Sequence, residues 1–173
     1  MLALARSAME AALAGCPPPG LPEVAAVALR RGAFVTLLEQ DGRVLRGCIG
    51  HVAGDRPLGE VIRSVAVSAA RSDPRFPPVE ADELASLQIE ISVLSEPVPV
   101  SSSDLSRLVM GRDGLLVRRG HAQAVLLPQV ATEQGFSREA FLDAVCHKAG
   151  LAPGSWREPG TQVFTFTADV FVE

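Results

Sequence analysis

A cysteine between two glycines is the residue of this sequence best suited to chemistry. Residues 45–50 read Leu-Arg-Gly-Cys-Ile-Gly and end an apolar run that is typical of a β-strand. Glycines let a partner approach the backbone closely. Arg46 carries a permanent charge that would favour a thiolate at Cys48 or an anionic ligand. The stretch therefore predicts a site built around Cys48.

Two interpretations of Cys48 are open. As a nucleophile it needs partial exposure and a nearby cation or base, and His51 is a candidate base if the chain turns at Gly50. Alternatively, Cys48 fills a small apolar space at the end of a strand, which is the commoner fate of a lone cysteine. The sequence alone favours the second interpretation.

Arg46 lies two residues before Cys48, so in an extended strand both side chains point to one face. Arg46 either binds a carboxylate or phosphate, or forms a structural ion pair for which Glu90 is a candidate partner. The glycines are explained by backbone geometry, in a tight turn or against a ligand. The ligand-lining residues expected on this strand are Arg46, Gly47, Ile49 and Gly50.

A proline-rich loop supplies a second group of candidates, in the segment Asp73-Pro74-Arg75-Phe76. Asp73 is expected to orient an arginine, and Arg75 to face Cys48. The alternative is a purely structural loop, in which Asp73 forms an Asx-type turn and Phe76 enters the core. A structural loop that lines a cleft can serve both purposes.

Glu90 lies with Gln88 and Ser92 on the polar face of a predicted strand. A carboxylate there is a general base, a metal ligand or a solvated side chain, and the alternation of the strand already explains it.

Metal binding has weak support. Cys48 and His51 supply two ligands, and the adjacent Cys146 and His147 point apart on a helix, whereas zinc needs at least three protein ligands. We expect no metal and no cofactor.

These residues must be positioned by many short elements. Periodicity predicts helices over 2–14, 58–71 and 138–149, with shorter helical segments over 104–110 and 129–134. Strands are predicted over 33–39, 43–49, 87–94, 114–118, 122–127 and 163–171, with a hairpin turn at Asp41-Gly42. This order predicts an α+β fold with a mainly antiparallel sheet flanked by helices, and 173 residues fit a single domain.

Composition narrows the class of protein. A net charge of −4 gives no general attraction to nucleic acid or to anionic membranes, and base-stacking aromatic residues are scarce. No apolar run approaches the ~20 residues that span a bilayer, and the N-terminus lacks the pattern of a secretory signal. Three cysteines without paired spacing predict a reduced, cytoplasmic protein.

Several separated blocks match one known family. The first block is Leu45-Arg46-Gly47-Cys48-Ile49-Gly50. The second block combines Asp73-Pro74-Arg75-Phe76-Pro77-Pro78, Glu83-Leu84 and residues 89–94. The third block includes Leu126-Leu127-Pro128-Gln129-Val130, Lys148-Ala149-Gly150-Leu151 and Trp156. On these blocks the chain resembles the AMMECR domain family, whose prokaryotic members are called AmmeMemoRadiSam system protein A. The resemblance covers nearly the whole chain, with one departure: His51 occupies a position where the family usually has threonine.

The resemblance implies a single AMMECR-type domain over residues 1–173, an α+β fold with a larger lobe, a smaller lobe and a cleft between them. It implies a pathway shared with a Memo-like protein and a radical S-adenosylmethionine enzyme, but no established activity.

Two functional hypotheses follow. In the first, a small or peptide-like anionic ligand binds in a cleft around residues 45–50 and 73–76, and in its stronger form Cys48 is a nucleophile. In the second, the protein is a non-enzymatic interaction module that docks the Memo-like and radical-enzyme partners through the same surface.

Overall fold

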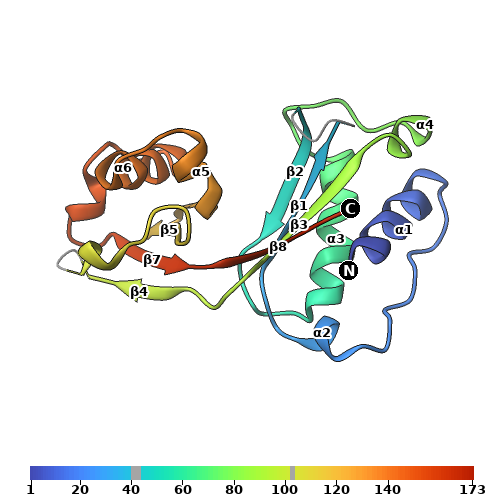
Figure 1. Cartoon of the computed structure of the whole chain (residues 1–173), viewed down its shortest axis with the longest axis horizontal. Coiled ribbons are helices and arrows are strands. Elements are labelled where there is room, and N and C mark those ends of the chain that lie inside the picture. The colour runs from blue at the N-terminus through green and yellow to red at the C-terminus, as the bar shows by residue number, and fades with distance from the viewer. Residues whose placement is uncertain (40–43, 102–103) are drawn as a thin grey trace. The chain divides into compact units, whose positions relative to one another are not determined.

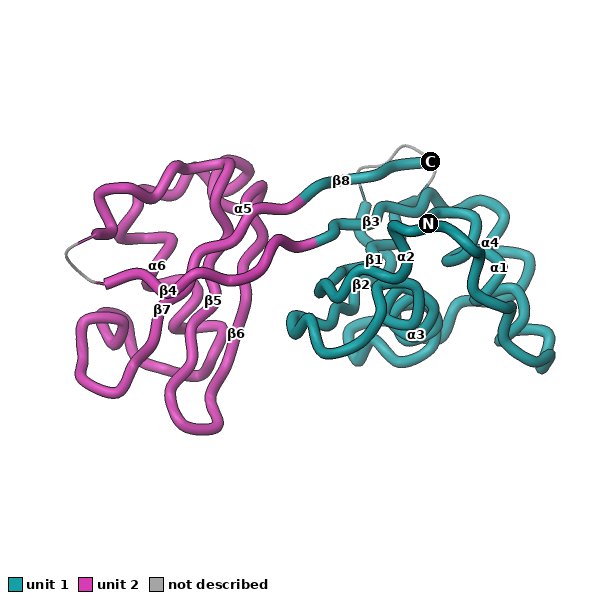
Figure 2. Tube along the Cα trace, turned by 90° about the horizontal axis from the view of Figure 1, so that it is seen from below, with its two compact units in different colours: residues 1–93, 169–173 teal, residues 94–168 magenta. Residues whose placement is uncertain are grey.

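The chain folds into two compact units. The computed structural model describes residues 1–39, 44–101 and 104–173. Unit 1 comprises Met1–Val93 and Asp169–Glu173, and unit 2 comprises Leu94–Ala168 (Figure 2). Unit 2 is therefore inserted, in sequence, between two segments of unit 1. The described residues include no helix that is both long and apolar enough to cross a membrane.

Unit 1 combines a four-stranded sheet with helices. In chain order its elements are α1 (Leu2–Leu13), α2 (Ala25–Ala28), β1 (Ala33–Leu38), β2 (Leu45–His51), α3 (Leu58–Arg71), α4 (Ala81–Leu84), β3 (Gln88–Leu94) and β8 (Ala168–Val172). The strand order is β2-β1-β3-β8, and β1 is antiparallel to both of its neighbours (Figure 1).

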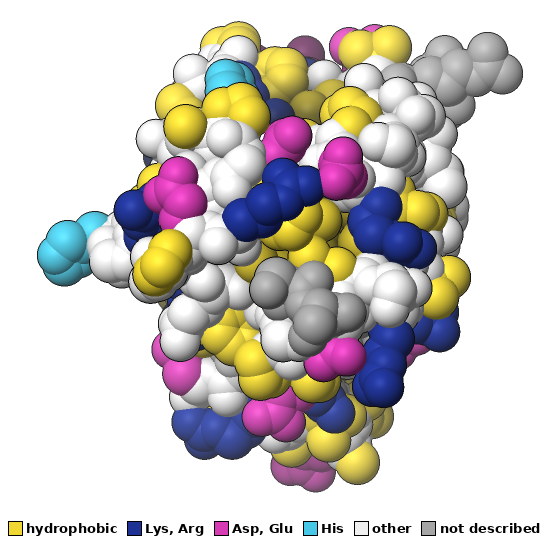
Figure 3. Space-filling view, turned by 90° about the vertical axis from the view of Figure 1, so that its left-hand side faces the viewer, with side chains coloured by type: hydrophobic (Ala, Val, Ile, Leu, Met, Phe, Trp, Pro, Cys, Tyr) yellow, Lys and Arg dark blue, Asp and Glu magenta, His cyan; other side chains and the backbone are white. Residues whose placement is uncertain are grey.

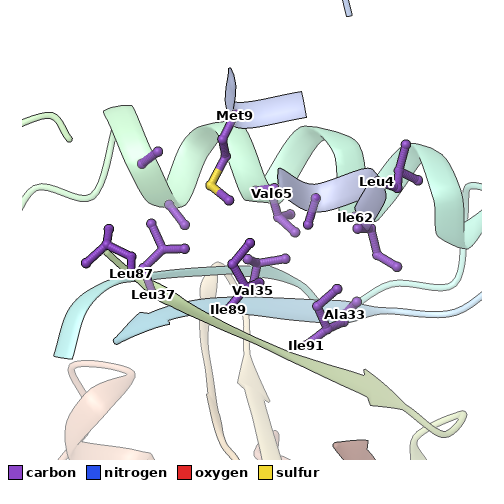
Figure 4. Packing of buried hydrophobic residues seen from close by; sticks show 14 of the residues in the cluster. Leu4, Met9, Ala33, Val35, Leu37, Ile62, Val65, Leu87, Ile89 and Ile91 are labelled. Atoms are coloured by element: carbon purple, nitrogen blue, oxygen red, sulfur yellow. The ribbon is translucent and has the colours of Figure 1, made fainter. Parts of the chain in front are cut away.

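The core of unit 1 lies between the helices and one face of this sheet. Met9 of α1 and Ile62 of α3 point toward Val35, Ile89 and Ile91 of the strands, all of them fully or almost fully buried (Figure 4). The helix over 58–71 forms as predicted, because its apolar residues recur at helical spacing and face the sheet.

Unit 2 has its own four-stranded sheet. Its elements are β4 (Val98–Val100), a 3₁₀ turn (Leu105–Arg107), β5 (Gly114–Arg119), β6 (Ala122–Leu126), α5 (Pro128–Glu133), α6 (Arg138–Lys148), a second 3₁₀ turn (Ser155–Arg157) and β7 (Gln162–Phe166). The strand order is β4-β7-β5-β6, with antiparallel pairing throughout.

The core of unit 2 is formed by α6 against β5. Phe141 and Val145 are fully buried and belong to the same cluster as Leu115 and Val117. Ser137 begins α6, since its hydroxyl accepts a 3.2 Å hydrogen bond from the N–H of Ala140.

The predicted α+β class with antiparallel pairing is confirmed, although the strands form two sheets. Three details of the prediction are wrong. Residues 163–171 are two strands in different sheets, β7 and β8; the helix over 104–110 is reduced to a single 3₁₀ turn; and Cys48 lies in the middle of β2, not at its end. The hairpin turn predicted at Asp41-Gly42 lies outside the described residues.

Candidate functional site

Three polar side chains form a row across the sheet of unit 1. Thr36 of β1 is paired with Cys48 of β2 on one side and with Glu90 of β3 on the other. Side chains alternate along a strand, and the intervening residues Val35 and Leu37 enter the core beneath α3. The row therefore lies on the face opposite α1 and α3.

Cys48 is half-buried, which answers the question of its exposure: it is neither a sealed core residue nor fully exposed. The Thr36 hydroxyl donates a hydrogen bond to Cys48 Sγ at 3.2 Å. Thr36 was missed by sequence reasoning. It becomes visible only once the register of β1 against β2 is known.

The glycines beside Cys48 provide close packing. A Cβ at Gly47 would overlap the carbonyl oxygen of Ala69, so glycine lets α3 pack directly on β2. A Cβ at Gly50 would overlap the ring of Phe34, which lies against the Gly50 backbone. Neither residue forms a turn, because both lie within β2.

Alternation along β2 separates the predicted ligand-lining residues. Ile49 packs against the core cluster of unit 1, and Gly47 faces α3. Cys48 and Gly50 share the opposite face. The structure therefore does not bring Gly47 and Ile49 to the row that contains Cys48.

The loop over residues 72–78 holds β2 through Asp73. The Asp73 side chain is only 2% exposed. Its carboxylate accepts hydrogen bonds from the main-chain N–H of Cys48 at 2.8 Å and from that of Arg75 at 3.1 Å. The second bond is the predicted Asx-type turn.

Arg75 completes this arrangement. Its Nε and Nη2 donate to the two oxygens of Asp73 at 2.9 and 2.7 Å, and Nη2 also donates to the carbonyl oxygen of Cys48 at 3.3 Å. The structure thus brings together Cys48, Asp73 and Arg75, as the sequence predicted. We call Thr36, Cys48, Asp73, Arg75 and Glu90 the Cys48 site.

Asp73 and Arg75 shift each other's pKa in opposite directions. The hydrogen bonds from Arg75 hold the pKa of the buried Asp73 carboxyl well below its usual range, against the opposing effect of burial. The hydrogen bond to Asp73 in turn raises the pKa of Arg75, and negative charge at Cys48 adds to this rise. The guanidinium therefore remains a fixed cation beside Cys48.

Phe76 does not enter the core, contrary to the structural alternative for this loop. Phe76 is half-buried outside the core cluster, with the Arg75 guanidinium carbon 5.4 Å from its ring centroid. Val79 is the residue of this region that is buried in the core. Phe76 instead supports Arg75 by a cation–π contact.

Arg46 forms a structural ion pair. Its Nε and Nη2 lie 2.5 and 3.0 Å from the two carboxylate oxygens of Glu83, and its Nη1 donates to the carbonyl of Pro77 at 3.0 Å. The partner is Glu83, not Glu90. Because its donors are largely engaged, Arg46 fixes the 72–78 loop to β2 and has little capacity left for a ligand.

His51 lies at the end of β2, with Nε2 2.6 Å from Oδ1 of Asp55. An odd separation of three residues along the strand puts His51 and Cys48 on opposite faces. The structure therefore does not place His51 as a base for Cys48. The contact with His51 lowers the pKa of Asp55.

Among the described residues, no three His, Cys, Asp or Glu side chains lie close enough together to hold a metal ion. The Cys48 site is instead suited to binding an anion and to nucleophilic attack. It combines a partly exposed sulfur, a hydroxyl donor and a carboxylate in one row of the sheet with a fixed cation on the neighbouring 72–78 loop.

Comparison with known proteins identifies the family to which the chain belongs. A family model described as AMMECR1 matches residues 2–171. A protein of Methanothermobacter thermautotrophicus is 45% identical over 181 residues, covering 100% of this chain and 92% of that protein. A protein of Thermococcus gammatolerans is 44% identical over 150 residues, covering 83% of this chain and 73% of that protein.

A solved structure is similar as well. The crystal structure of an uncharacterized protein from Pyrococcus horikoshii matches with a TM-score of 0.92 and 38% sequence identity, covering 99% of this chain and 89% of that chain.

Proposed function

The chain belongs to the AMMECR1 family, and we propose that it binds a small or peptide-like anionic ligand beside Cys48, around residues 45–50. The observation that supports this proposal is a fixed guanidinium bound to the main chain of Cys48, whose thiol is partly exposed. Arg75 is tied to both Asp73 and the Cys48 carbonyl, so its charge is held at the thiol-bearing strand.

Arg75 has capacity left for a ligand. Its side chain is 53% exposed, and its hydrogen bonds to Asp73 and Cys48 use only Nε and Nη2. In the described part of the chain, no group accepts a hydrogen bond from Nη1. A carboxylate or phosphate at Nη1 would gain a charge-assisted hydrogen bond without disturbing the bonds to Asp73.

In the stronger form of the proposal, Cys48 is a nucleophile. The Thr36 hydroxyl and the Arg75 charge favour the thiolate over the thiol. Its sulfur would attack an electrophilic carbon of the ligand, forming an S–C bond, while the leaving group departs with its bonding electron pair. Glu90, in the same row, is the candidate to transfer a proton to or from the ligand.

We further propose a setting for this function. The protein acts in the cytoplasm, in a pathway with a Memo-like protein and a radical S-adenosylmethionine enzyme, as the resemblance of the sequence implies. Three cysteines without paired spacing support a reducing compartment.

The experiment compares two alkylating reagents that differ in charge. Anionic iodoacetate and neutral iodoacetamide both alkylate a thiolate with loss of iodide. Rates at each cysteine are measured by mass spectrometry over a range of pH. We expect the ratio of the iodoacetate rate to the iodoacetamide rate to be about tenfold higher at Cys48 than at the exposed Cys16, because one charge-assisted hydrogen bond is worth ~1.5 kcal/mol.

The chain offers internal controls. Cys16 is exposed, and Cys146 is buried, with burial raising the pKa of its thiol, so Cys146 should not react in the folded protein. Arg75→Gln should reduce the ratio at Cys48 to that of Cys16. If iodoacetate shows no preference for Cys48, the anion-binding proposal fails. If Cys48 reacts no faster than Cys16 with iodoacetamide at neutral pH, a nucleophilic role for Cys48 is excluded.

A further inference from the structure

We propose that β8 is a docking edge for an extended, basic segment of another protein, which pairs with β8 as an added strand of the unit 1 sheet. The strand order β2-β1-β3-β8 makes β8 an edge strand, on the side of the sheet away from β2 and its Cys48. Figure 2 shows β8 beside β3, and no described strand pairs with its outer side. This inference is therefore independent of the function proposed for the Cys48 site.

The two ends of β8 show which of its main-chain groups point outward. At one end the N–H of Glu173 donates to the carbonyl of Ile89 at 3.1 Å. At the other end the N–H of Ser95 donates to the carbonyl of Thr167 at 2.9 Å, so one antiparallel register holds along the whole strand. Residues that bond the neighbouring strand alternate with residues that do not. The N–H and C=O of Val170, and those of the residues two positions to either side, therefore point away from β3, and no hydrogen bond reaches them in the described part of the chain.

The other edge strands of the described sheets are each protected against pairing with another chain. The pair of Asp73 and Arg75 bonds the main chain in the middle of β2. β4 contains Pro99, which lacks an N–H and is typical of edges. On β6 the Nζ of Lys148 donates to the carbonyl of Val125 at 2.9 Å. β8 has neither a proline nor a basic residue, and no described side chain bonds its outward main-chain groups.

β8 also exposes three consecutive apolar side chains. Val170, Phe171 and Val172 are 47%, 39% and 49% exposed. The face drawn in Figure 3 shows the usual surface pattern, in which hydrophobic side chains are interspersed with acidic and basic ones. An edge strand that is both apolar and unpaired is a template for pairing with another chain. An added strand would bond the outward main-chain groups and cover the two valines on one face and Phe171 on the other.

The unpaired charge at β8 is negative, which indicates a basic occupant. Asp169 is exposed and has no ion-pair partner among the described residues. Arg6, the cation at the end of β8, is already bonded to Glu173 and to two main-chain carbonyls. A lysine or arginine opposite Asp169 would form a cross-strand pair of opposite charge, which stabilises strand pairing. A second copy of β8 would instead add its own carboxylates to this edge, and like charges across strands are destabilising.

The test titrates the ¹⁵N-labelled full chain with the hexapeptide acetyl-Lys-Val-Thr-Val-Lys-Thr-amide. In antiparallel pairing its lysines lie opposite Glu173 and Asp169, and its valines lie opposite Val172 and Val170. We expect the amide protons of Val170 and Val172 to move downfield saturably, because they gain hydrogen bonds. The amide proton of Phe171 faces β3 and should move less.

The charge of the occupant is tested with the reversed peptide acetyl-Glu-Val-Thr-Val-Glu-Thr-amide. It should bind about tenfold more weakly, since two favourable cross-strand charge pairs become unfavourable ones. Asp169→Lys should shift the preference toward the acidic peptide.

The main-chain bonds are tested at Val170. Val170→Pro removes an outward N–H and leaves the bonds to β3 intact, because this N–H does not face β3. It should weaken binding of the basic peptide about tenfold. Val170→Thr keeps the N–H and a β-branched side chain, and as the matched control it should bind within about twofold of the wild type. A basic peptide methylated at both valine nitrogens tests the same bonds without altering the protein, and it should not bind.

The proposal is overturned if the amide peak of Val170 does not move up to the solubility limit of the basic peptide. It is also overturned if the acidic peptide or the methylated peptide binds as tightly as the basic one, or if a folded Val170→Pro variant binds like the wild type. Sedimentation of the wild type as a dimer that Val170→Pro makes monomeric would place a second copy on this edge and would equally overturn the proposal.

Discussion

The main-chain N–H of Cys48 donates a 2.8 Å hydrogen bond to Oδ2 of Asp73, which joins the middle of β2 to the loop that follows α3. The same carboxylate orients Arg75, whose Nη2 returns to the Cys48 carbonyl. The two main-chain polar groups of Cys48 are thus both engaged by one acid–base pair, and the position of the sulfur depends on that pair.

Asp73→Asn should destabilise the protein by about 2–4 kcal/mol. The amide cannot accept all of the hydrogen bonds that the buried carboxylate accepts, and it leaves the Arg75 charge without its counter-ion. The measurement is the free energy of unfolding in urea. Asp169→Asn, at an exposed residue of β8, is the matched control and should change this free energy little.

The same pair predicts how stability depends on pH. The pKa of Asp73 is lowered by folding, so the folded state holds the carboxylate ionised under conditions in which the unfolded chain binds a proton. The contribution to stability is complete above the unfolded pKa of about 3.9 and is lost as pH falls below it. Urea unfolding between pH 6 and pH 2.5 should show a steeper loss for wild type than for Asp73→Asn. If the free energy of unfolding falls equally with pH in wild type and in Asp73→Asn, ionisation of Asp73 does not contribute to stability.

Gly47→Ala and Gly50→Ala should lower the free energy of unfolding by different amounts. The added methyl at Gly47 overlaps a backbone carbonyl of α3, which cannot move aside without shifting the helix, so we expect a loss of about 2–3 kcal/mol. The methyl at Gly50 overlaps the Phe34 side chain. A second substitution, Phe34→Leu, should recover part of the Gly50→Ala loss and none of the Gly47→Ala loss. Gly20→Ala, in open space, is the control.

Arg46→Lys should cost about 1 kcal/mol, because lysine keeps the charge but loses the two-pronged contact with Glu83. A double-mutant cycle of Arg46→Ala with Glu83→Ala tests the pair directly. A coupling energy indistinguishable from zero would mean that the contacts between Arg46 and Glu83 add nothing to stability.

Ser92→Ala should be neutral or stabilising by up to about 1 kcal/mol. The hydroxyl of Ser92 is buried and has no hydrogen-bond partner within the described structure, so its removal relieves a desolvation cost. Ser137→Ala should do the opposite and cost about 1 kcal/mol, because it removes the hydrogen bond that begins α6. Thermal unfolding of the two variants compares them.

The sequence predicted those features that depend on local pattern. The helix over 58–71 was predicted to the residue, since the periodicity of its apolar residues defines it. The Asx-type turn at Asp73 and its contact with Arg75 were also expected. These successes share a cause, because each feature depends on residues close together in sequence or on a single strong periodicity.

Features that depend on pairing between distant segments were not predictable. Thr36 joins the Cys48 site only through the register of β1 against β2. Glu83 of α4, not Glu90, neutralises Arg46. Val79, not Phe76, reaches the core. In each case several chemically equivalent residues were available, and tertiary packing selected one.

The position of β8 also has a consequence for how the protein is assembled during synthesis. β3 and β8 are neighbours in one sheet, yet all of unit 2 lies between them in the chain. The entropic cost of closing a long loop grows only slowly with its length, and a folded insert shortens the effective loop further. On the ribosome, unit 2 can fold as soon as it emerges, whereas unit 1 must wait with an unpaired β3 edge until β8 has been made.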